Sequence, residues 1–408
     1  MSVEVINFGC RLNIAEGEAI RAAAAGHDDL IIINSCAVTK EAERQARQAI
    51  RRAAKRRPDA RIIVTGCAAE IGAFSNMAEV SGSVGNRDKK SPAEYGSHKA
   101  DQSFFDQNIL KPAVSGADHA RAFVEVQNGC DHRCTFCIIP FGRGDSRSVP
   151  AGLVIDAVKA AVARGQQEVI LTGVDLTSYG PDLPGSPTLG HLVERILTHV
   201  PDLPRLRLSS MDSIEIDDRL ADLITGEPRV MPHIHLSLQS GDDMILKRMK
   251  RRHSRAQAVA LIDRLKSKRP ALTIGADIIA GFPTETDTMF ENSVALLEEC
   301  DIVFGHIFPY SPRPGTPAAL MPQIDRVTIK ARAERLRSAA NARKATWLSS
   351  MIGTRQNILI ELDGQSGHAE NFASVRLDTP LPNRNMQGNM IKLLITASDG
   401  QTLTGIPV

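Results

Sequence analysis

Hydrophobic residues in the first 80 positions form three short runs, which are separated by mostly polar stretches of helical periodicity. The runs are VEVINFGC, LIIINSC and RIIVTGC, and the clearest helical stretch between them is Glu41–Arg57. Short apolar runs that alternate with helices are typical of parallel βαβ units. The pattern therefore predicts a three-layer α/β domain at the start of the chain.

The alternation weakens at about residue 81 and resumes at Arg121. The stretch between contains SGSVGNRDKKSPAEYGSHKADQS, which is polar and rich in Gly and Ser, so it is expected to be a connector. From 121 to 349 six βα units predict an open parallel (β/α)6 barrel, with its chemistry at the C-terminal strand ends. The six expected strands are Phe123–Gln127, Glu168–Thr172, Arg205–Ser209, His233–Leu238, Leu272–Ile279 and Ile302–Phe308.

The period changes again in the segment 350–408. There RQNILIELDG, HAENFASVRL and NMIKLLITASDG alternate polar and apolar residues and are interrupted by Gly, which predicts a small all-β module. The expected fold class is therefore α/β. It combines an N-terminal βαβ domain of the flavodoxin or Rossmann type, a central open barrel and a C-terminal all-β module.

Composition narrows the class of protein further. A chain of 408 residues with 42% apolar residues suits two or three domains with a sizeable core. The formal charge of +2 gives no overall sign of a nucleic-acid partner. No apolar run approaches the roughly 20 residues of a spanning helix, and the start of the chain does not resemble a secretory signal. We expect a cytoplasmic protein with no membrane partner, in which seven cysteines indicate metal or redox chemistry rather than disulfides.

Three cysteines stand at equivalent places in the N-terminal pattern. Cys10, Cys36 and Cys67 each follow a predicted strand. Parallel strands end at the same edge of a sheet, where ligands bind, so these thiols are expected to meet in space. Isolated buried cysteines are usually inert, and this is the interpretation for Cys300 at the end of a helical stretch. A shared position at three strand ends favours a metal site instead.

A second set of three cysteines lies in NGCDHRCTFCIIP, directly after the first barrel strand. Cys130, Cys134 and Cys137 are separated by three and by two residues, so one short loop can wrap a compact cluster. Iron–sulfur clusters are held by such local thiolate sets, and three thiolates on a four-iron cluster leave one iron open for a substrate. The alternative is a closed structural zinc site with His132 as the fourth ligand.

The CxxxCxxC spacing, with Phe136 just before the last cysteine, resembles the radical S-adenosylmethionine (SAM) superfamily. The resemblance implies a 4Fe-4S cluster on Cys130, Cys134 and Cys137, whose open iron binds the amino and carboxylate groups of SAM. In that superfamily an external electron donor drives cleavage of SAM to methionine and a 5′-deoxyadenosyl radical.

Further motifs resemble one family of that superfamily, the methylthiotransferases. GCRLNIAEGE, INSCAVT and VTGC are similar to its N-terminal domain, and GCDHRCTFCIIPFGRGDSRSVP, LSLQSGDDMILKRMKR, DIIAGFPTET and YSPRPGTPA are similar to its radical domain. The resemblance implies a second 4Fe-4S cluster, which is held by Cys10, Cys36 and Cys67 and carries the sulfur to be inserted. It also implies that the C-terminal module is similar to the family's TRAM domain, with domain limits at 1–120, 121–349 and 350–408.

GCRLN, LTGVDLTSYG and GHAENF are most similar to the branch that modifies threonylcarbamoyladenosine. This implies insertion of a methylthio group at C2 of N6-threonylcarbamoyladenosine at position 37 of tRNA, with SAM as radical source and methyl donor. One alternative is the same chemistry on isopentenyladenosine of tRNA or on an aspartate of a ribosomal protein. Another, of a different class, is a non-catalytic, metal-stabilised RNA-binding protein.

Several residues at or near strand ends are expected to contact SAM. The LTGVD segment offers backbone oxygens to the methionyl amino group, and polar side chains at later strand ends offer hydrogen bonds, although ordinary strand-end caps would have the same pattern. Asp277 is equally consistent with a buried, satisfied carboxylate, and Arg313 is expected to face an anion. The expected SAM contacts are Phe136, Thr172, Gly173, Val174, Ser209, Ser210 and Gln239.

Two basic stretches are candidates for RNA contacts, because a near-neutral chain concentrates positive charge in them. The first recurs every three or four positions and therefore lies on one helix face. A solvated surface is the alternative for both. The expected partner is the anticodon stem-loop of tRNA, since RNA is read mainly through single-stranded loops. The residues are Arg44, Arg47, Arg51 and Lys55 in the first stretch, and Lys247, Arg248, Lys250, Arg251 and Arg252 in the second.

Overall fold

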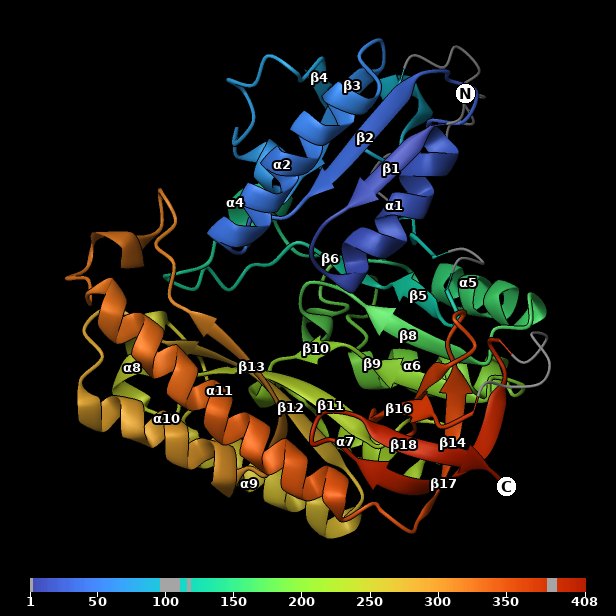
Figure 1. Cartoon of the computed structure of the whole chain (residues 1–408), viewed down its shortest axis with the longest axis vertical. Helices are drawn as coiled ribbons and strands as arrows, with labels where there is room; N and C mark the ends of the chain where they lie inside the picture. The colour runs from blue at the N-terminus through green and yellow to red at the C-terminus, as the bar shows by residue number, and fades with distance from the viewer. Residues whose placement is uncertain (1–2, 96–110, 116–118, 380–386) are drawn as a thin grey trace.

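The computed structural model describes residues 3–95, 111–115, 119–379 and 387–408 (Figure 1). Its N-terminal part, drawn at the top of Figure 1, is a parallel sheet with the strand order β1-β2-β3-β4. Every residue of β2 is buried, as in a strand that is covered on both faces. The strands are β1 (Glu4–Asn7), β2 (Leu30–Ser35), β3 (Arg61–Gly66) and β4 (Gly82–Ser83).

Two helices cover opposite faces of this sheet. Leu30 and Ile32 of β2 pack with Ile20 of helix α1 (Arg11–Ala23). The alternate residues Ile31 and Ile33 pack with Ile50 of helix α2 (Lys40–Arg56). Because side chains alternate between the faces of a strand, this arrangement gives the three layers that the sequence predicts.

The polar segment after residue 81 is not a connector throughout. β4 pairs with β3, and Val84 and Tyr95 are buried in the same core as α1. The short helical turn η1 (Pro92–Tyr95) closes this part. The expectation of a connector from about residue 81 is therefore wrong for 82–95, because few but buried apolar side chains tie this polar stretch to the sheet.

The central part contains six parallel strand positions that alternate with helices. One sheet has the order β5-β8-β9 and the next β10-β11-β12-β13, and Ser209 alone separates β9 from β10. Strand limits match the predicted ones to within two residues, apart from the break at Ser209. The strands are β5 (Ala122–Glu125), β8 (Glu168–Thr172), β9 (Arg205–Leu208), β10 (Ser210–Met211), β11 (His233–Gln239), β12 (Thr273–Ala280) and β13 (Ile302–Pro309).

The helices of this central part cover the outer face of the strands. Leu236 and Ile274 join a large core with Ile262 and Leu336 of the surrounding helices, and the alternate strand residues face inward. Short elements fill the connections: β6 (Gln127–Asn128), β7 (Arg147–Ser148), η2 (Leu176–Ser178), η3 (Ser213–Glu215) and η4 (Pro317–Leu320). The helices are α4 (Ile139–Arg143), α5 (Ala151–Ala163), α6 (Leu189–His199), α7 (Asp218–Gly226), α8 (Asp243–Met249), α9 (Arg255–Lys268), α10 (Asp287–Glu299) and α11 (Arg326–Ser349).

The C-terminal strands form a small closed barrel with the order β14-β15-β16-β18-β17, drawn in red in Figure 1. Its own core contains Ile358, Val375 and Leu393. The all-β module that the sequence predicts is thus present, and the class of the whole chain is α/β. The strands are β14 (Arg355–Ile360), β15 (Ser366–Ala369), β16 (Ser374–Leu377), β17 (Met390–Ser398) and β18 (Leu403–Pro407).

A buried carboxylate holds this module against the central strands. Glu168, at the start of β8, is fully buried, and its Oε1 lies 2.8 Å from Arg207 Nε and 3.1 Å from Arg121 Nε. Arg207 then donates to the backbone oxygens of Ala369 and Glu370 at 2.8 and 2.7 Å. A charge that is removed from water is stable only with such partners, so the position of the C-terminal module depends on Glu168.

We expect Glu168→Gln to destabilise the protein by about 3–5 kcal/mol, because it leaves buried guanidinium groups without their shared anion. The midpoint of thermal unfolding should fall by several degrees. The matched control is Glu194→Gln, which removes an exposed partner of Arg219 and should change stability by less than about 1 kcal/mol. Equal midpoints for both variants would contradict a structural role for Glu168.

Candidate functional site

The three N-terminal cysteines meet at the C-terminal edge of the first sheet. Cys10 precedes α1, Cys36 follows β2, and Cys67 begins the short helix α3 (Cys67–Glu70) after β3. The chain approaches closely here, because a Cβ atom on Gly9 would lie 2.9 Å from Cys36 Sγ. Burial, together with smaller contributions from the neighbouring Cys10 and Cys67, raises the pKa of Cys36 to about 12. The expected convergence of these thiols is confirmed.

The second cysteine set lies in the loop between β6 and α4, and helix α8 holds this loop in place. Thr135 donates its backbone N–H to Met249 O at 3.1 Å and its hydroxyl to Arg248 O at 2.8 Å. Burial raises the pKa of Cys137 to about 12, and the nearby thiols of Cys134, Cys130 and Cys67 add to the shift. These three cysteines therefore also lie together, as predicted from their spacing.

The two cysteine sets face each other across the junction of the N-terminal and central parts. A Cβ atom on Gly142 of α4 would lie 3.0 Å from Cys67 Cβ, so a larger residue would have to push this close approach apart. Asn86 donates its side-chain amide to Gly142 O. Cys67 is moreover among the groups that raise the pKa of Cys137. The fold thus places one cysteine set beside the other.

A buried ionic network fixes this junction. Both carboxylate oxygens of Glu16 on α1 accept hydrogen bonds at 2.9 Å from the guanidinium of Arg143, six residues after Cys137. Lys89 Nζ lies 2.7 Å from the same carboxylate, and the side chains of Glu16 and Lys89 have no exposed surface. Burial raises the pKa of Glu16, but Arg143 and Lys89 outweigh it and hold the pKa well below its usual range.

The donor atoms of both sets are cysteine thiols, which suit iron–sulfur clusters. Ligands of a tetrahedral zinc lie about 2.0–2.3 Å from the metal and hence within roughly 4 Å of one another. Within the described residues, two groups of potential ligands lie within 4.8 Å of one another, and neither contains a cysteine. His132 belongs to one of them with Asp175, and its Nε2 is 2.6 Å from Asp175 Oδ2. His132 is thus paired with a carboxylate, and thiolates alone are the donor set that 4Fe-4S clusters use.

His132 belongs to a charged network beside the cysteine loop. Asp175 and Glu215 raise its pKa to about 10, so its imidazole carries a positive charge at neutral pH. Arg252 pairs with Glu215 at 2.8 Å, and Arg251 pairs with Asp212 at 3.0 Å. The three carboxylates of this group are therefore paired with cations of the protein, and the network forms a charged framework beside the cysteine loop.

The expected SAM contacts lie at the same strand ends. Thr172 ends β8, and the following turn is held by Gln127, whose Oε1 accepts from the backbone N–H groups of Val174 and Asp175 at 3.0 Å each. Gly173 allows the turn to approach Gln127, since a Cβ atom there would lie 2.9 Å from Gln127 O. The backbone of this turn is thereby fixed next to the second cysteine set.

The other expected SAM contacts differ in whether their side chains interact with other residues of the protein. Ser209 is buried between β9 and β10, and among the described residues its Oγ has no hydrogen-bond partner. Gln239 ends β11 at a register shift and has a left-handed backbone with φ of 68°. Ser210 begins β10, and Phe136 packs edge to face on Phe282 at 6.4 Å. The free Ser209 oxygen and the strained Gln239 are features of a ligand site.

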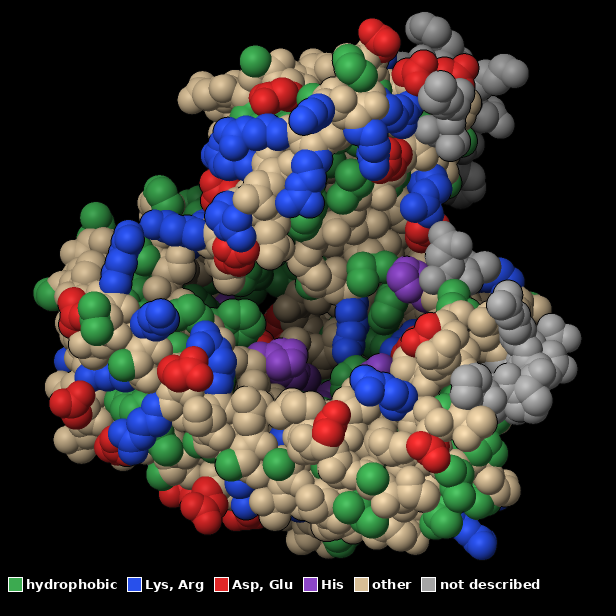
Figure 2. Space-filling model, in the orientation of Figure 1, with side chains coloured by type: hydrophobic (Ala, Val, Ile, Leu, Met, Phe, Trp, Pro, Cys, Tyr) green, Lys and Arg blue, Asp and Glu red, His purple; other side chains and the backbone are tan. Residues whose placement is uncertain are grey.

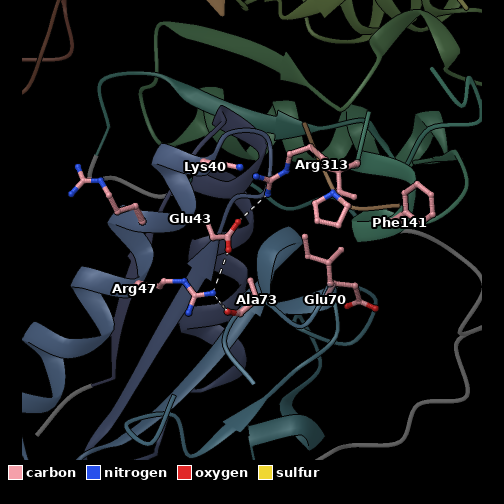
Figure 3. A pocket seen from close by; sticks show the side chains of 11 residues that line it. Lys40, Glu43, Arg47, Glu70, Ala73, Phe141 and Arg313 are labelled. Atoms are coloured by element: carbon pink, nitrogen blue, oxygen red, sulfur yellow. Dashed lines mark hydrogen bonds and ion pairs between the residues drawn. The ribbon is translucent and has the colours of Figure 1, made fainter. Parts of the chain in front are cut away.

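The basic face of α2 borders a cavity of about 750 Å³. Figure 3 shows Glu43 between Arg313 and Arg47, with Arg313 Nη2 3.0 Å from Glu43 Oε2. Arg313 therefore faces an anion, as expected, but this anion belongs to the protein. Arg44 pairs with Glu41 at 2.5 Å, whereas Arg51 is 4.0 Å from Glu79, and Lys55 forms no ion pair within the described residues.

The second basic stretch divides into arginines that contact other residues of the protein and lysines that are exposed. Arg251 points to the cysteine loop, with Nη1 3.6 Å from Cys134 Sγ, and Arg248 donates to Thr284. Arg252 contacts His132 at 3.0 Å. Lys247 and Lys250 are exposed. The three arginines, of which Arg252 is itself exposed, are therefore bonded to the protein, whereas the two exposed lysines are available to a partner.

Inward-facing side chains of the central strands line a hollow in the middle of the molecule, where Figure 2 shows histidine and basic groups. Asp277 on β12 accepts from His235 at 2.9 Å, and His306 on β13 lies 3.4 Å from the same oxygen. Asp277 is thus a satisfied carboxylate. The hollow lies between the N-terminal sheet, the central strands and the C-terminal barrel (Figures 1 and 2).

Sequence reasoning missed the residues that assemble the site: Glu16, Lys89, Gln127, Arg143 and Asp175. Lys89 stands in the polar stretch GNRDKK, where nothing local distinguishes it from a solvated lysine. The LTGVD segment contains Asp175, but the sequence suggested a role only for the backbone oxygens of this segment. Their common feature is burial of a polar group, and burial depends on elements far away in the chain.

Comparisons with known proteins agree with this geometry. Residues 124–297 match the radical SAM superfamily model, and residues 2–83 match the model of an uncharacterized protein family, UPF0004. The methyltransferase TsrM from Kitasatospora setae, a radical SAM enzyme, shares the fold with a TM-score of 0.50, at 16% identity over 75% of this chain and 67% of that one. Fold and cysteine sets define a radical SAM enzyme.

Proteins of similar sequence show to which family of radical SAM enzymes the chain belongs. The threonylcarbamoyladenosine tRNA methylthiotransferase MtaB of Rickettsia prowazekii is 50% identical over 92% of this chain and 91% of its own. MtaB of Thermotoga maritima is 34% identical over 88% and 86%. A tRNA-2-methylthio-N(6)-dimethylallyladenosine synthase of Erythrobacter litoralis is 32% identical over the same shares. The chain belongs to the MtaB family of radical SAM methylthiotransferases.

Membership of this family establishes the cofactors as SAM and 4Fe-4S clusters. The thiolate-only donor sets and the free Ser209 oxygen fit such cofactors. No helix among the described residues is long and apolar enough to cross a membrane.

We expect anaerobic reconstitution to load roughly eight irons per chain, from about four per cluster. Cys134→Ala should lose about half of this iron and the matching visible absorbance. The control is Cys300→Ala, since Cys300 is fully buried in the core beside β13 and should keep the full iron content. Full iron in Cys134→Ala, or one to two zinc ions in the wild-type protein, would contradict the assignment.

Proposed function

We propose that the protein inserts a methylthio group at C2 of N6-threonylcarbamoyladenosine at position 37 of tRNA. SAM serves both as radical source and as methyl donor. The observation that carries the proposal is the 50% identity to a threonylcarbamoyladenosine tRNA methylthiotransferase over nearly the whole of both chains. The alternatives on isopentenyladenosine and on a ribosomal protein are not favoured. The dimethylallyladenosine synthase is 32% identical to this chain, compared with 50% for the threonylcarbamoyladenosine enzyme.

The two cysteine sets divide the work in this proposal. Cys130, Cys134 and Cys137 are proposed to hold the SAM-binding cluster, and the set Cys10, Cys36 and Cys67 the cluster that delivers sulfur. When bound, the first cluster supplies the electron that cleaves SAM, and the second supplies the inserted sulfur. The short distance between Cys67 and Gly142 supports this division, because the substrate carbon has to meet both.

The protein's own residues bind and orient SAM. Gln127 fixes the turn after β8, so that backbone oxygens of Thr172 and its neighbours meet the methionyl amino group. Ser209 offers a buried hydroxyl at the next strand end. Arg251, 3.6 Å from Cys134 Sγ, offsets negative charge on the thiolate side. The proposed contacts are Phe136, Thr172, Gly173, Val174, Ser209, Ser210 and Gln239.

The proposal also covers the domain limits, the cellular location and the electron donor of the enzyme. The domains are 1–120, 121–349 as an open (β/α)6 barrel, and 350–408 as a TRAM-like module, which the closed order of five strands supports. A cytoplasmic location suits tRNA as substrate and keeps the cysteines reduced. An external electron donor completes the reaction.

Exposed cations are proposed to dock the anticodon stem-loop. Arg51 and Lys55 on α2, and Lys247 and Lys250 near α8, are exposed and lack close ion pairs within the described residues. Arg44 and Arg47 lie on the same helix face, although their carboxylate neighbours already offset much of their charge. Phosphate contacts of this kind position the RNA but do not read its sequence.

The function is tested with a reconstituted enzyme and an anticodon stem-loop that carries threonylcarbamoyladenosine. The wild-type enzyme should form the methylthio nucleoside, seen by mass spectrometry, and should leave an isopentenyladenosine stem-loop unchanged. Cys36→Ala should still cleave SAM to 5′-deoxyadenosine but insert nothing, whereas Cys137→Ala should do neither. Circular dichroism checks that both variants fold, since loss of a cluster can unfold its domain. Methylthiolation by folded Cys36→Ala, or of the isopentenyl substrate alone, would refute the proposal.

Docking is tested by the salt dependence of RNA binding. Each phosphate contact adds about 0.7–0.9 to the slope of log affinity against log salt. The double variant Arg51→Ala/Lys55→Ala should bind the stem-loop more weakly and with a flatter slope. The control is Arg264→Ala/Lys268→Ala on α9, where both cations are paired with aspartates. An unchanged slope in the α2 variant would return this face to an ordinary solvated surface.

A further inference from the structure

Arg11 lies where the N-terminal part meets the C-terminal barrel. It is the first residue of α1 and follows Cys10 directly. Its guanidinium carbon is 5.2 Å from the ring centroid of Phe372, which comes from the loop between β15 and β16. Phe372 in turn stacks on His233 of β11 at 4.8 Å. The segments GCRLN and GHAENF, from opposite ends of the chain, thus meet at this contact.

The position of Phe372 is imposed by its surroundings. Its backbone has φ of 70°, a left-handed conformation that is unfavourable for an aromatic residue. The ring of His368 also stacks on Phe372, with 4.9 Å between the centroids, and the guanidinium carbon of Arg207 lies 5.1 Å from the Phe372 centroid. Such strain persists where the fold needs a side chain in one place, and here it provides a platform under Arg11.

The charge of Arg11 is only partly balanced: burial and the charges of Arg121 and Arg207 outweigh the nearby Glu168 and lower the pKa of Arg11 to about 10. Within the described residues its guanidinium forms no hydrogen bond or ion pair. The neighbouring arginines are matched: Glu168 binds Arg207 and Arg121, and Glu361 also binds Arg121 at 2.7 Å. A half-buried cation beside other cations is unfavourable unless an anion comes to it. The site is therefore prepared for an anionic group of a ligand.

The proposed substrate carries such a group at a suitable distance. Its threonyl carboxylate is attached through N6 to the same six-membered ring that contains C2. From this ring to the carboxylate is about two residue lengths, on the order of 7 Å. Cys10 and Arg11 are consecutive, about 3.8 Å apart at Cα, so a carbon held at the sulfur-delivering cysteines leaves the carboxylate within reach of a neighbouring arginine.

We propose that Arg11 binds the carboxylate of the N6-threonylcarbamoyl group and makes the enzyme select this substrate over uncharged N6 substituents. The inference rests on the proposed function and names the residue that recognises its substrate. A planar guanidinium can form two parallel hydrogen bonds to a carboxylate, and it can do so while its face lies on an aromatic ring, as that of Arg11 lies over Phe372.

The test compares two anticodon stem-loops, one with threonylcarbamoyladenosine and one in which the threonyl carboxylate is a carboxamide. The holoenzyme should prefer the free acid by about 10- to 100-fold in kcat/KM and in Kd, as expected for a charge-assisted hydrogen bond. Arg11→Gln should bring this ratio close to one, and Arg11→Lys should restore part of it. The charge-matched control Arg264→Gln on α9 should keep the ratio.

Iron content is measured for each variant, because Arg11 adjoins Cys10. If Arg11→Gln is inactive, the ratio of Kd values still decides the question. An equal loss with both RNAs, or an undiminished preference for the acid, would overturn the role of Arg11 alone, provided the wild-type enzyme acts on the threonylcarbamoyl RNA. A wild-type enzyme that does not act on this RNA would overturn both the proposed function and the inference.

Discussion

The buried ion pair between Glu16 and Arg143 is the interaction on which the arrangement of the site depends. A carboxylate without exposed surface is tolerable only when cations surround it, so α1, the cysteine loop and Lys89 cannot separate without a large loss of free energy. This constraint keeps Cys67 beside Gly142, and thereby one cysteine set beside the other. The network contributes positional accuracy more than net stability, because apolar residues could fill the same space at a lower desolvation cost.

The same principle recurs at the other side of the central strands, where Glu168 gathers arginines that reach the C-terminal barrel. Together the two buried carboxylates connect three parts of the chain around one hollow, which Figure 2 shows open to solvent. The three parts also contact one another through side chains: Arg11 of α1 lies over Phe372 of the C-terminal barrel, and Phe372 stacks on His233 of the central strands. The hollow thus lies next to the N-terminal and central parts, which contain the two cysteine sets.

Period and spacing predicted the secondary structure well, because strand and helix patterns are written locally in the chain. The strand Glu168–Thr172 agrees with the structure at both ends, and helix α2 differs from its expected limits by one residue. The cysteine sets were also predictable, since strand ends of parallel sheets meet at one edge. Prediction was wrong for 82–95, where a few buried side chains outweigh a polar composition, and it did not separate Arg251 from the exposed Lys250, although both belong to one basic stretch.

The sequence by itself determined the α/β class, the two sets of three cysteines and the resemblance to methylthiotransferases, because periodicity, spacing and motifs need no knowledge of distant contacts. Only the tertiary structure decided which polar groups are buried and with what they pair. Arg11 and Arg121 look alike in the chain, yet Arg121 forms ion pairs with two carboxylates, whereas Arg11 stands over an aromatic ring and forms no ion pair within the described residues. The physical reason is that the energy of a charge depends on its surroundings, and those surroundings come from residues hundreds of positions away.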